Sequence, residues 1–154
     1  KEVAEAAESL GIECCQEVLN RYETYIITDC REGLEYCRRV GSENVNLLLD
    51  TFHMNIEEDN MFTSIKKYIS KIGCIHICEN HRGVPGTGHI DWKQLIETLE
   101  EVGYDGFLEM ETFTEKGTEV ARGMGIWRQI GKETPLEEAK KGIHFLKKTM
   151  KQEV

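Results

Sequence analysis

Apolar residues along this chain fall into two alternating patterns, short continuous runs and segments in which they recur every three or four positions. A continuous run is typical of a strand buried on both faces, and the recurring pattern is typical of a helix with one buried face. The runs predict strands at residues 12–19, 45–49, 73–78 and 106–110. The recurring segments predict helices at residues 2–10, 29–40, 59–69, 91–102 and 134–150.

Strand and helix alternate four times with short connections, which predicts an α/β fold with a parallel sheet. Residues 1–154 are expected to form a single domain, since no linker or low-complexity segment interrupts the pattern. Four such (β/α) units build either an open sheet or half of an eight-stranded barrel, which typically needs roughly 250 residues. The chain begins inside a predicted helix and without an initiator Met, so we expect a C-terminal piece of a larger protein.

The composition narrows the class of partner. No apolar run approaches the length of a membrane span, and the formal net charge of −9 argues against a nucleic-acid partner. Six cysteines occur without any sign of secretion, which favours reduced thiols and a cytoplasmic protein. Cys74, His76 and Cys78 alternate along one predicted strand. Their outer members are about 13 Å apart by the strand rise, too far to share one zinc ion.

Each predicted strand carries a possible metal ligand near its carboxyl end, and these ligands are Glu17, Asp50, His76 and Glu111. The carboxyl ends of parallel strands meet at one edge, so we expect the four side chains to converge. Three carboxylates and one imidazole suit Mn²⁺, Mg²⁺ or Co²⁺ better than an ion that prefers thiolates. Each residue alone has an ordinary alternative, such as a solvated loop edge or, for Asp50, a helix cap.

Three more polar side chains follow these candidate ligands closely in the sequence. His53 lies three positions after the aspartate of the second strand, where we expect the strand to run out into a loop. Arg82 lies six positions after the histidine of the third strand, in a turn rich in glycine and proline. Glu23 lies six positions after the glutamate of the first strand. An exposed surface turn is the ordinary alternative for Arg82.

Four segments of the sequence resemble the ketose 3-epimerases, the D-tagatose and D-psicose 3-epimerase group of the xylose-isomerase-like TIM-barrel superfamily: EVLNRYE, LLDTFHMNIEED, IHICENHRGVPGTGHIDW and LEMETF. The resemblance implies the C-terminal half of a TIM (β/α)8 barrel, in which the first four strands of the family have no counterpart. It places the family's metal ligands on Glu17, Asp50, His76 and Glu111. It places the substrate-binding residues on Glu23, His53 and Arg82.

The activity implied by this resemblance is inversion of C3 of a free ketohexose or related ketose through an enediolate. The implied cofactor is a divalent ion, Mn²⁺ first and Co²⁺ or Mg²⁺ as alternatives. Inverting a stereocentre without a redox cofactor needs a base on each face of the carbon. Glu17 and Glu111, from the first and last of these strands, are the expected catalytic pair.

Three alternatives share parts of the pattern. An aldose–ketose isomerase or an inosose dehydratase would use the same ligands on another substrate. A nuclease related to endonuclease IV would need more ligands and a basic groove, which the net charge of −9 disfavours. The third alternative is a non-catalytic half-barrel whose only role is to assemble with another copy of itself or with a partner. Its two open sheet edges predict a homo-oligomer or pairing with a missing N-terminal half.

Overall fold

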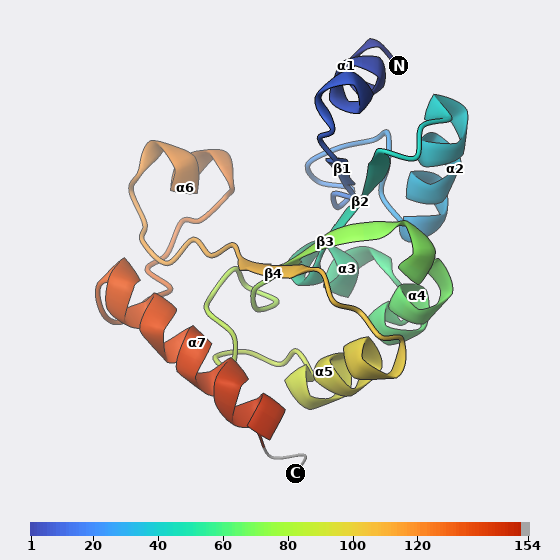
Figure 1. The fold of residues 1–154 in the computed structure, drawn as a ribbon. Helices are drawn as coiled ribbons and strands as arrows, with labels where there is room; N and C mark the ends of the chain where they lie inside the picture. Colours follow the sequence, from blue (N-terminus) through green and yellow to red (C-terminus); the bar gives the residue numbers. More distant parts are fainter. Residues whose placement is uncertain (152–154) are drawn as a thin grey trace.

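The structure, a computed structural model, describes residues 1–151 of the 154-residue chain. Four parallel strands form one sheet in the order β1-β2-β3-β4 (Figure 1). Their bounds are Cys14–Glu17, Val45–Asp50, Ile72–Ile77 and Phe107–Met110. The predicted parallel sheet is confirmed. The first strand is shorter than expected because only Cys14–Glu17 pairs with β2.

Seven α-helices are formed by the described residues, with a single 3₁₀ turn, η1 (Ile69–Lys71), after the fourth. The helices are α1 (Glu2–Leu10), α2 (Cys30–Val40), α3 (Thr51–Glu57), α4 (Met61–Tyr68), α5 (Trp92–Glu101), α6 (Glu119–Gly123) and α7 (Pro135–Lys151). Five match the predicted segments within three residues. Among these α-helices, none is long and apolar enough to cross a membrane.

Side-chain caps fix where the helices begin. The carboxylates of Asp29 and Asp91 accept hydrogen bonds from backbone N–H groups in the first turns of α2 and α5, and Asn60 does the same for α4. At the other end of α2, Gly41 adopts a left-handed conformation with φ 78°, which a side chain would disfavour. The strand-to-helix connections are therefore specified locally.

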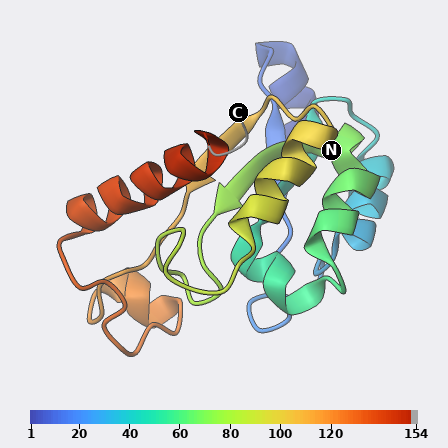
Figure 2. The ribbon, with the colours of Figure 1, turned by 90° about the horizontal axis from the view of Figure 1, so that it is seen from below.

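Helices α2, α4, α5 and α7 lie side by side in one layer along one side of the sheet (Figures 1 and 2). The core lies between this layer and the strands, where Leu47, Leu49 and Ile75 are fully buried. Side chains alternate between the two faces of a strand. The opposite face of the sheet carries Asn46, Leu48 and His76, which are only partly buried. No helix formed by the described residues covers this face.

Two expectations were wrong. The strand β2 does not run out into a loop, because α3 starts directly at Thr51. Asp50 caps this helix by accepting from the backbone N–H groups of Phe52, at 2.7 Å, and His53, at 3.4 Å. Short α6, capped by Thr118, lies in a stretch for which no helix was predicted. A helix of five residues has too few turns to produce a detectable apolar period.

Candidate metal and substrate site

The four predicted ligands come together at the carboxyl ends of the strands. One ligand atom from each of them lies within 4.8 Å of the others: Glu17, Asp50, His76 and Glu111. We call these four residues the quartet. The Nδ1 atom of His76 is 3.9 Å from Glu17 Oε1, 3.8 Å from Asp50 Oδ2 and 3.7 Å from Glu111 Oε2. One imidazole nitrogen thus faces three carboxylates at nearly equal distances.

This arrangement fits a divalent cation. His76 Nδ1 is the one buried side-chain nitrogen or oxygen atom that has no hydrogen-bond partner in the part of the chain described. An unpartnered buried polar atom is costly, and so is a buried carboxylate such as Asp50, which has no exposed surface. A cation placed between them would satisfy both, and oxygen and nitrogen donors suit a hard or borderline ion. Metal binding by the quartet stays a prediction.

The far side of the His76 ring has a neighbour that the sequence did not indicate. Glu109 is paired with His76 across β3 and β4, and its Oε2 lies 3.4 Å from His76 Nε2. A carboxylate beside the second ring nitrogen is the usual way to orient a metal-binding histidine. Cys74 joins these two in a second group within 4.8 Å. Cys78 instead faces the quartet, with its Sγ 3.6 Å from Asp50 Oδ1.

Arg82 lies buried against the quartet and is not part of an exposed turn. It is 3% exposed. Its NH1 group donates to Asp50 Oδ2 at 2.8 Å and to Glu111 Oε2 at 2.9 Å. The guanidinium also lies 4.2 Å from the centre of the Phe52 ring. Arg82 therefore offsets the negative charge of the quartet and occupies a restrained position beside it.

The backbone of the Arg82 loop is held in an unusual conformation. Among residues 1–151, Arg82 is the only non-glycine residue with a positive φ, 65°. The buried Glu79 carboxylate accepts from Gly86 N at 2.8 Å, from Ile90 N at 3.2 Å and from Trp92 Nε1 at 2.6 Å. These bonds close the loop after β3 on itself and fix the direction of Arg82. Sequence reasoning missed Glu79.

His53, on α3, is buried between Arg82 and the segment after β1. Its Nδ1 accepts from the backbone N–H of Asn20 at 3.1 Å and lies 2.8 Å from Asn20 Nδ2. Its Nε2 is 2.9 Å from Arg82 NH2 and 3.6 Å from Glu17 Oε1. Burial first, and then the positive charge of Arg82, lowers the pKa of His53 to about 3. The ring is therefore neutral near pH 7.

Glu23 lies at the exposed edge of this arrangement. Its Oε1 accepts from Asn20 Nδ2 at 2.9 Å, so the same amide contacts Glu23 and His53. All three predicted substrate-binding residues thus lie around the quartet: Glu23, His53 and Arg82. Asn20, which connects two of them, was missed because nothing in the sequence marks a contact across 33 positions.

Two carboxyl groups of the quartet, those of Glu17 and Asp50, have raised pKa values. Burial first, and then the nearby carboxylates of Glu111 and Asp50, raises the pKa of Glu17 to about 7. Burial also raises the pKa of Asp50, although Arg82 opposes that change. A carboxyl with a pKa near neutrality can both accept and return a proton at working pH. This is the property that a catalytic acid–base group needs.

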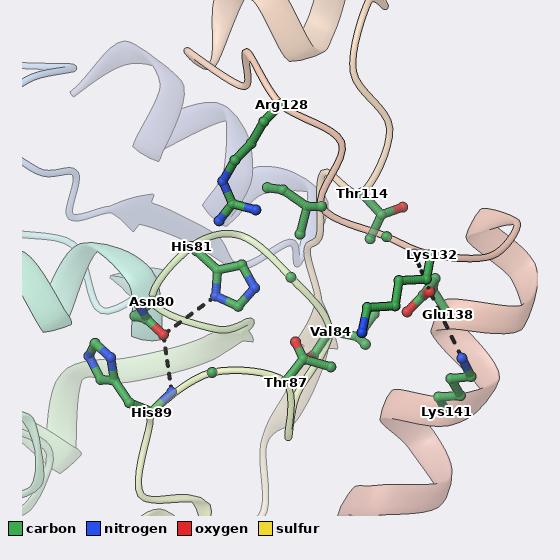
Figure 3. Close-up of a pocket in the computed structure, with 14 residues that line it drawn as sticks. Asn80, His81, Val84, Thr87, His89, Thr114, Arg128, Lys132, Glu138 and Lys141 are labelled. Carbon is green, nitrogen blue, oxygen red and sulfur yellow. Dashed lines mark hydrogen bonds and ion pairs between the residues drawn. The ribbon is translucent and has the colours of Figure 1, made fainter.

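A separate cavity of about 650 Å³ lies between the loop after β3 and the segment leading into α7 (Figure 3). His81 and Arg128 line one side, and Lys132 and Lys141 lie toward α7 with the buried Glu138. No quartet residue lines this cavity. The quartet instead faces the open side of the sheet, so this cavity is not the predicted site.

Comparisons with known proteins agree with this geometry. The family described as xylose isomerase-like TIM barrel matches residues 1–149. D-psicose 3-epimerase of Ruminiclostridium cellulolyticum is 43% identical over 130 residues, which are 84% of this chain and 44% of that protein. Ketose 3-epimerase of Arthrobacter globiformis is 39% identical over 130 residues, 83% of this chain and 45% of that protein.

Solved structures give the same picture. A D-psicose 3-epimerase from Clostridium cellulolyticum H10, crystallised with D-tagatose, matches 97% of this chain and 53% of that chain, with a TM-score of 0.90 and 39% identity. An L-ribulose 3-epimerase matches 98% of this chain and 51% of that chain, with a TM-score of 0.91 and 34% identity. The chain spans about half the length of the curated relatives it matches, and the half it matches is C-terminal.

Proposed function

Because this chain belongs to the xylose isomerase-like TIM-barrel family, we propose that it carries the metal-binding and acid–base residues of a sugar epimerase. The reaction is inversion of C3 of a free ketohexose or related ketose. The observation that carries the proposal is the meeting of Glu17 and Glu111, from the two outer strands, around His76. The names of the relatives support the reaction class, since they are D-psicose, ketose and L-ribulose 3-epimerases.

The quartet would hold the divalent ion, with Mn²⁺ the first expectation and Co²⁺ or Mg²⁺ the alternatives. Such an ion supplies Lewis-acid stabilisation for the negative charge that develops on the sugar oxygens. Asp50 and His76 have only this holding role in the proposal. The cap that Asp50 forms on α3 keeps one of its oxygens fixed.

Glu17 and Glu111 are the proposed catalytic residues. One carboxylate takes the proton from C3, which leaves an enediolate, and the other carboxyl returns a proton from the opposite face. The configuration of the substrate decides which residue acts as the base.

The remaining residues bind and orient the sugar. Arg82 donates to sugar oxygens from a guanidinium that the Phe52 ring and the loop after β3 restrain. His53 contributes a neutral imidazole, and Glu23 accepts from a hydroxyl group. We also propose that the open face of the sheet is covered in the active protein by a second half-barrel. That half is either another copy of this chain or an N-terminal half, since β1 and β4 leave two edges unpaired.

The test is solvent deuterium incorporation. The Mn²⁺-loaded chain is incubated in D₂O with D-fructose, D-psicose or D-tagatose, and the sugars are analysed by NMR. Deuterium at C3 together with the C3 epimer is the expected result. Label at C1 or C2 would indicate an aldose–ketose isomerase, and loss of water would indicate a dehydratase. Either result would contradict the proposed reaction.

Substitutions at Glu17 and Glu111 test whether each residue acts as a catalytic base. Glu17→Gln and Glu111→Gln are each expected to lower exchange at C3 by about 10²- to 10⁴-fold, with bound metal measured in parallel. Glu100→Gln, on the exposed side of α5, is the charge-matched control and is expected to keep wild-type exchange. A glutamine variant that keeps its metal and its full exchange rate rules out that residue as a base.

A further inference from the structure

Asn20 directs two donors, its backbone N–H and its side-chain amide, at one nitrogen of His53. Asn20 is 1% exposed and follows β1 in the sequence. Its backbone N is 3.1 Å from His53 Nδ1, and its Nδ2 is 2.8 Å from the same atom. The orientation of the amide is fixed without His53, because Oδ1 accepts from Tyr22 N at 2.9 Å and Nδ2 donates to Glu23 at 2.9 Å. Turning the amide over would break both of these bonds.

These contacts determine where the His53 ring carries its proton. A backbone N–H and an amide NH₂ can only donate, so Nδ1 must be the unprotonated, accepting nitrogen. A neutral imidazole then has its proton on Nε2. A second ring proton is excluded by the same geometry, since it would point at the two donors of Asn20.

The protonated nitrogen faces another donor. Arg82 NH2 lies 2.9 Å from His53 Nε2, and a guanidinium group cannot accept. The Glu17 oxygen that faces Nε2 is at 3.6 Å, beyond hydrogen-bond distance. Two donors therefore converge without an acceptor between them. An oxygen placed there would accept from both and remove the conflict.

We infer that Asn20 is a positioning residue, which holds the proton of His53 on Nε2 so that His53 and Arg82 donate together to one oxygen of the bound sugar. The part concerning the sugar rests on the proposed function, whereas the position of the proton does not. The shared Nδ2 also fixes Glu23. Asn20 thus positions two proposed sugar-binding side chains, His53 and Glu23, and is not itself proposed to contact the sugar.

The substitution Asn20→Asp separates this role from a purely structural one. Aspartate has the same shape and keeps an oxygen for the N–H of Tyr22, so the local turn is retained. It removes the donated bonds to His53 and Glu23 and places an acceptor beside Nδ1. Asn44→Asp is the control, because it introduces the same charge at a side chain that instead donates to the Ile12 carbonyl.

The experiment is imidazole ¹⁵N NMR of the labelled, Mg²⁺-loaded chain at pH 7, with His53 assigned by its loss in His53→Gln. We expect the wild type and Asn44→Asp to show a protonated Nε2 and an unprotonated Nδ1. Asn20→Asp is expected to move the proton toward Nδ1. Its affinity for D-psicose, measured by titration, is expected to fall about tenfold, as for the loss of one hydrogen bond to a buried group.

The outcomes separate the two claims. A wild-type His53 that is protonated on Nδ1, or on both nitrogens, overturns the inference whether or not any variant folds. An Asn20→Asp chain with an unchanged ring proton and unchanged sugar affinity also overturns it. A wild type with the expected proton that binds no ketose contradicts the proposed function and leaves the assignment of the proton in place.

Discussion

Leu47 and Leu49 point from β2 into the helix layer and are fully buried, whereas Leu48 between them lies on the face that no described helix covers. The same contrast runs across the sheet. Ile75 and Ile77 on β3 are 0% and 3% exposed. On β4, Phe107 is 75% exposed.

The covered face holds the fold together, and the open face carries the candidate site. Aliphatic side chains fill the covered face. The open face carries the polar or ionisable side chains of Asn46, Cys74, His76 and Glu109, and the quartet lies at the carboxyl end of this face. Strands of a parallel sheet are apolar on both faces only where both are buried in a dry core. A ligand site at the carboxyl edge accounts for the polar half of the pattern.

The largest expected effect tests this contrast on adjacent leucines. Leu49→Ala should lower the free energy of unfolding by about 2–5 kcal/mol, because it leaves a cavity in a closed core. Leu48→Ala, the matched control on the open face, should cost less than about 1 kcal/mol. Urea unfolding followed by circular dichroism measures both. Both variants are measured on the monomer, below the concentration at which the chain associates, where equal losses would contradict the contrast.

The second-largest expected effect is the gain in unfolding free energy when a metal ion binds the quartet on the open face. Mn²⁺ at about 100 times its dissociation constant should add about 2.7 kcal/mol to the free energy of unfolding, seen as a rise in Tm that EDTA reverses. Asp50→Asn should abolish the gain while keeping the cap on α3, since asparagine caps helices as well as aspartate does. Glu100→Gln should keep the gain. A Tm that does not respond to Mn²⁺, Co²⁺ or Mg²⁺ would contradict the metal site.

Self-association would cover the exposed Phe107. Light scattering at low micromolar concentration should give about twice the chain mass of 17.7 kDa. Burying one phenylalanine contributes about 1.5–3 kcal/mol, so Phe107→Ser should weaken association at least tenfold. Leu136→Ser, at a 64% exposed position on α7, is the control on the helix side and should leave the mass unchanged. A monodisperse monomer would show that this chain does not pair with itself.

The sequence predicted the sheet and the convergence of the quartet for a general reason. Parallel strands bring their carboxyl ends to one edge of the sheet whatever their register. The proximity of Glu17 and Glu111 could therefore be predicted before any distance was known. Fold class and the C-terminal half-barrel are confirmed by the matching family and structures. The start of α3 was missed because Asp50 ends a strand and caps a helix at once.

Residues that act through others could not be predicted. Asn20 contacts His53 across 33 positions, and Glu109 faces His76 only because β3 and β4 pair in that register. Glu79 is polar and lies in a loop, which gives no sign that its carboxylate is buried and accepts three N–H groups. Such contacts depend on how two segments meet in space, and no local pattern encodes that.

The smallest expected effect is a pH dependence that only the open face should show. The pKa of Glu17 is raised from its ordinary 4.5 to about 7 in the folded chain. Between these values the unfolded chain has released a proton that the folded chain still holds. Glu17 should therefore lower the metal-free stability as pH rises from about 4.5 to 7, by on the order of 1–2 kcal/mol once solvent screening of this half-buried carboxyl is allowed for. The lowered pKa of His53 contributes in the opposite direction up to about pH 6.5, so the Glu17 contribution is measured as the difference between the wild type and Glu17→Gln.

Urea unfolding in EDTA at pH 5, 6 and 7 measures this slope. Glu17→Gln should remove the Glu17 contribution, so that the stability of the variant falls less, or rises more, with pH than that of the wild type. The opposing contributions of Asp50 and His53 remain in both proteins. Leu49→Ala should lower stability by the same amount at every pH, because it removes no titrating group. Mn²⁺ should reverse the slope, since the ion binds carboxylates and competes with their protons. Equal pH dependences of stability for the wild type and Glu17→Gln would contradict the raised pKa of Glu17.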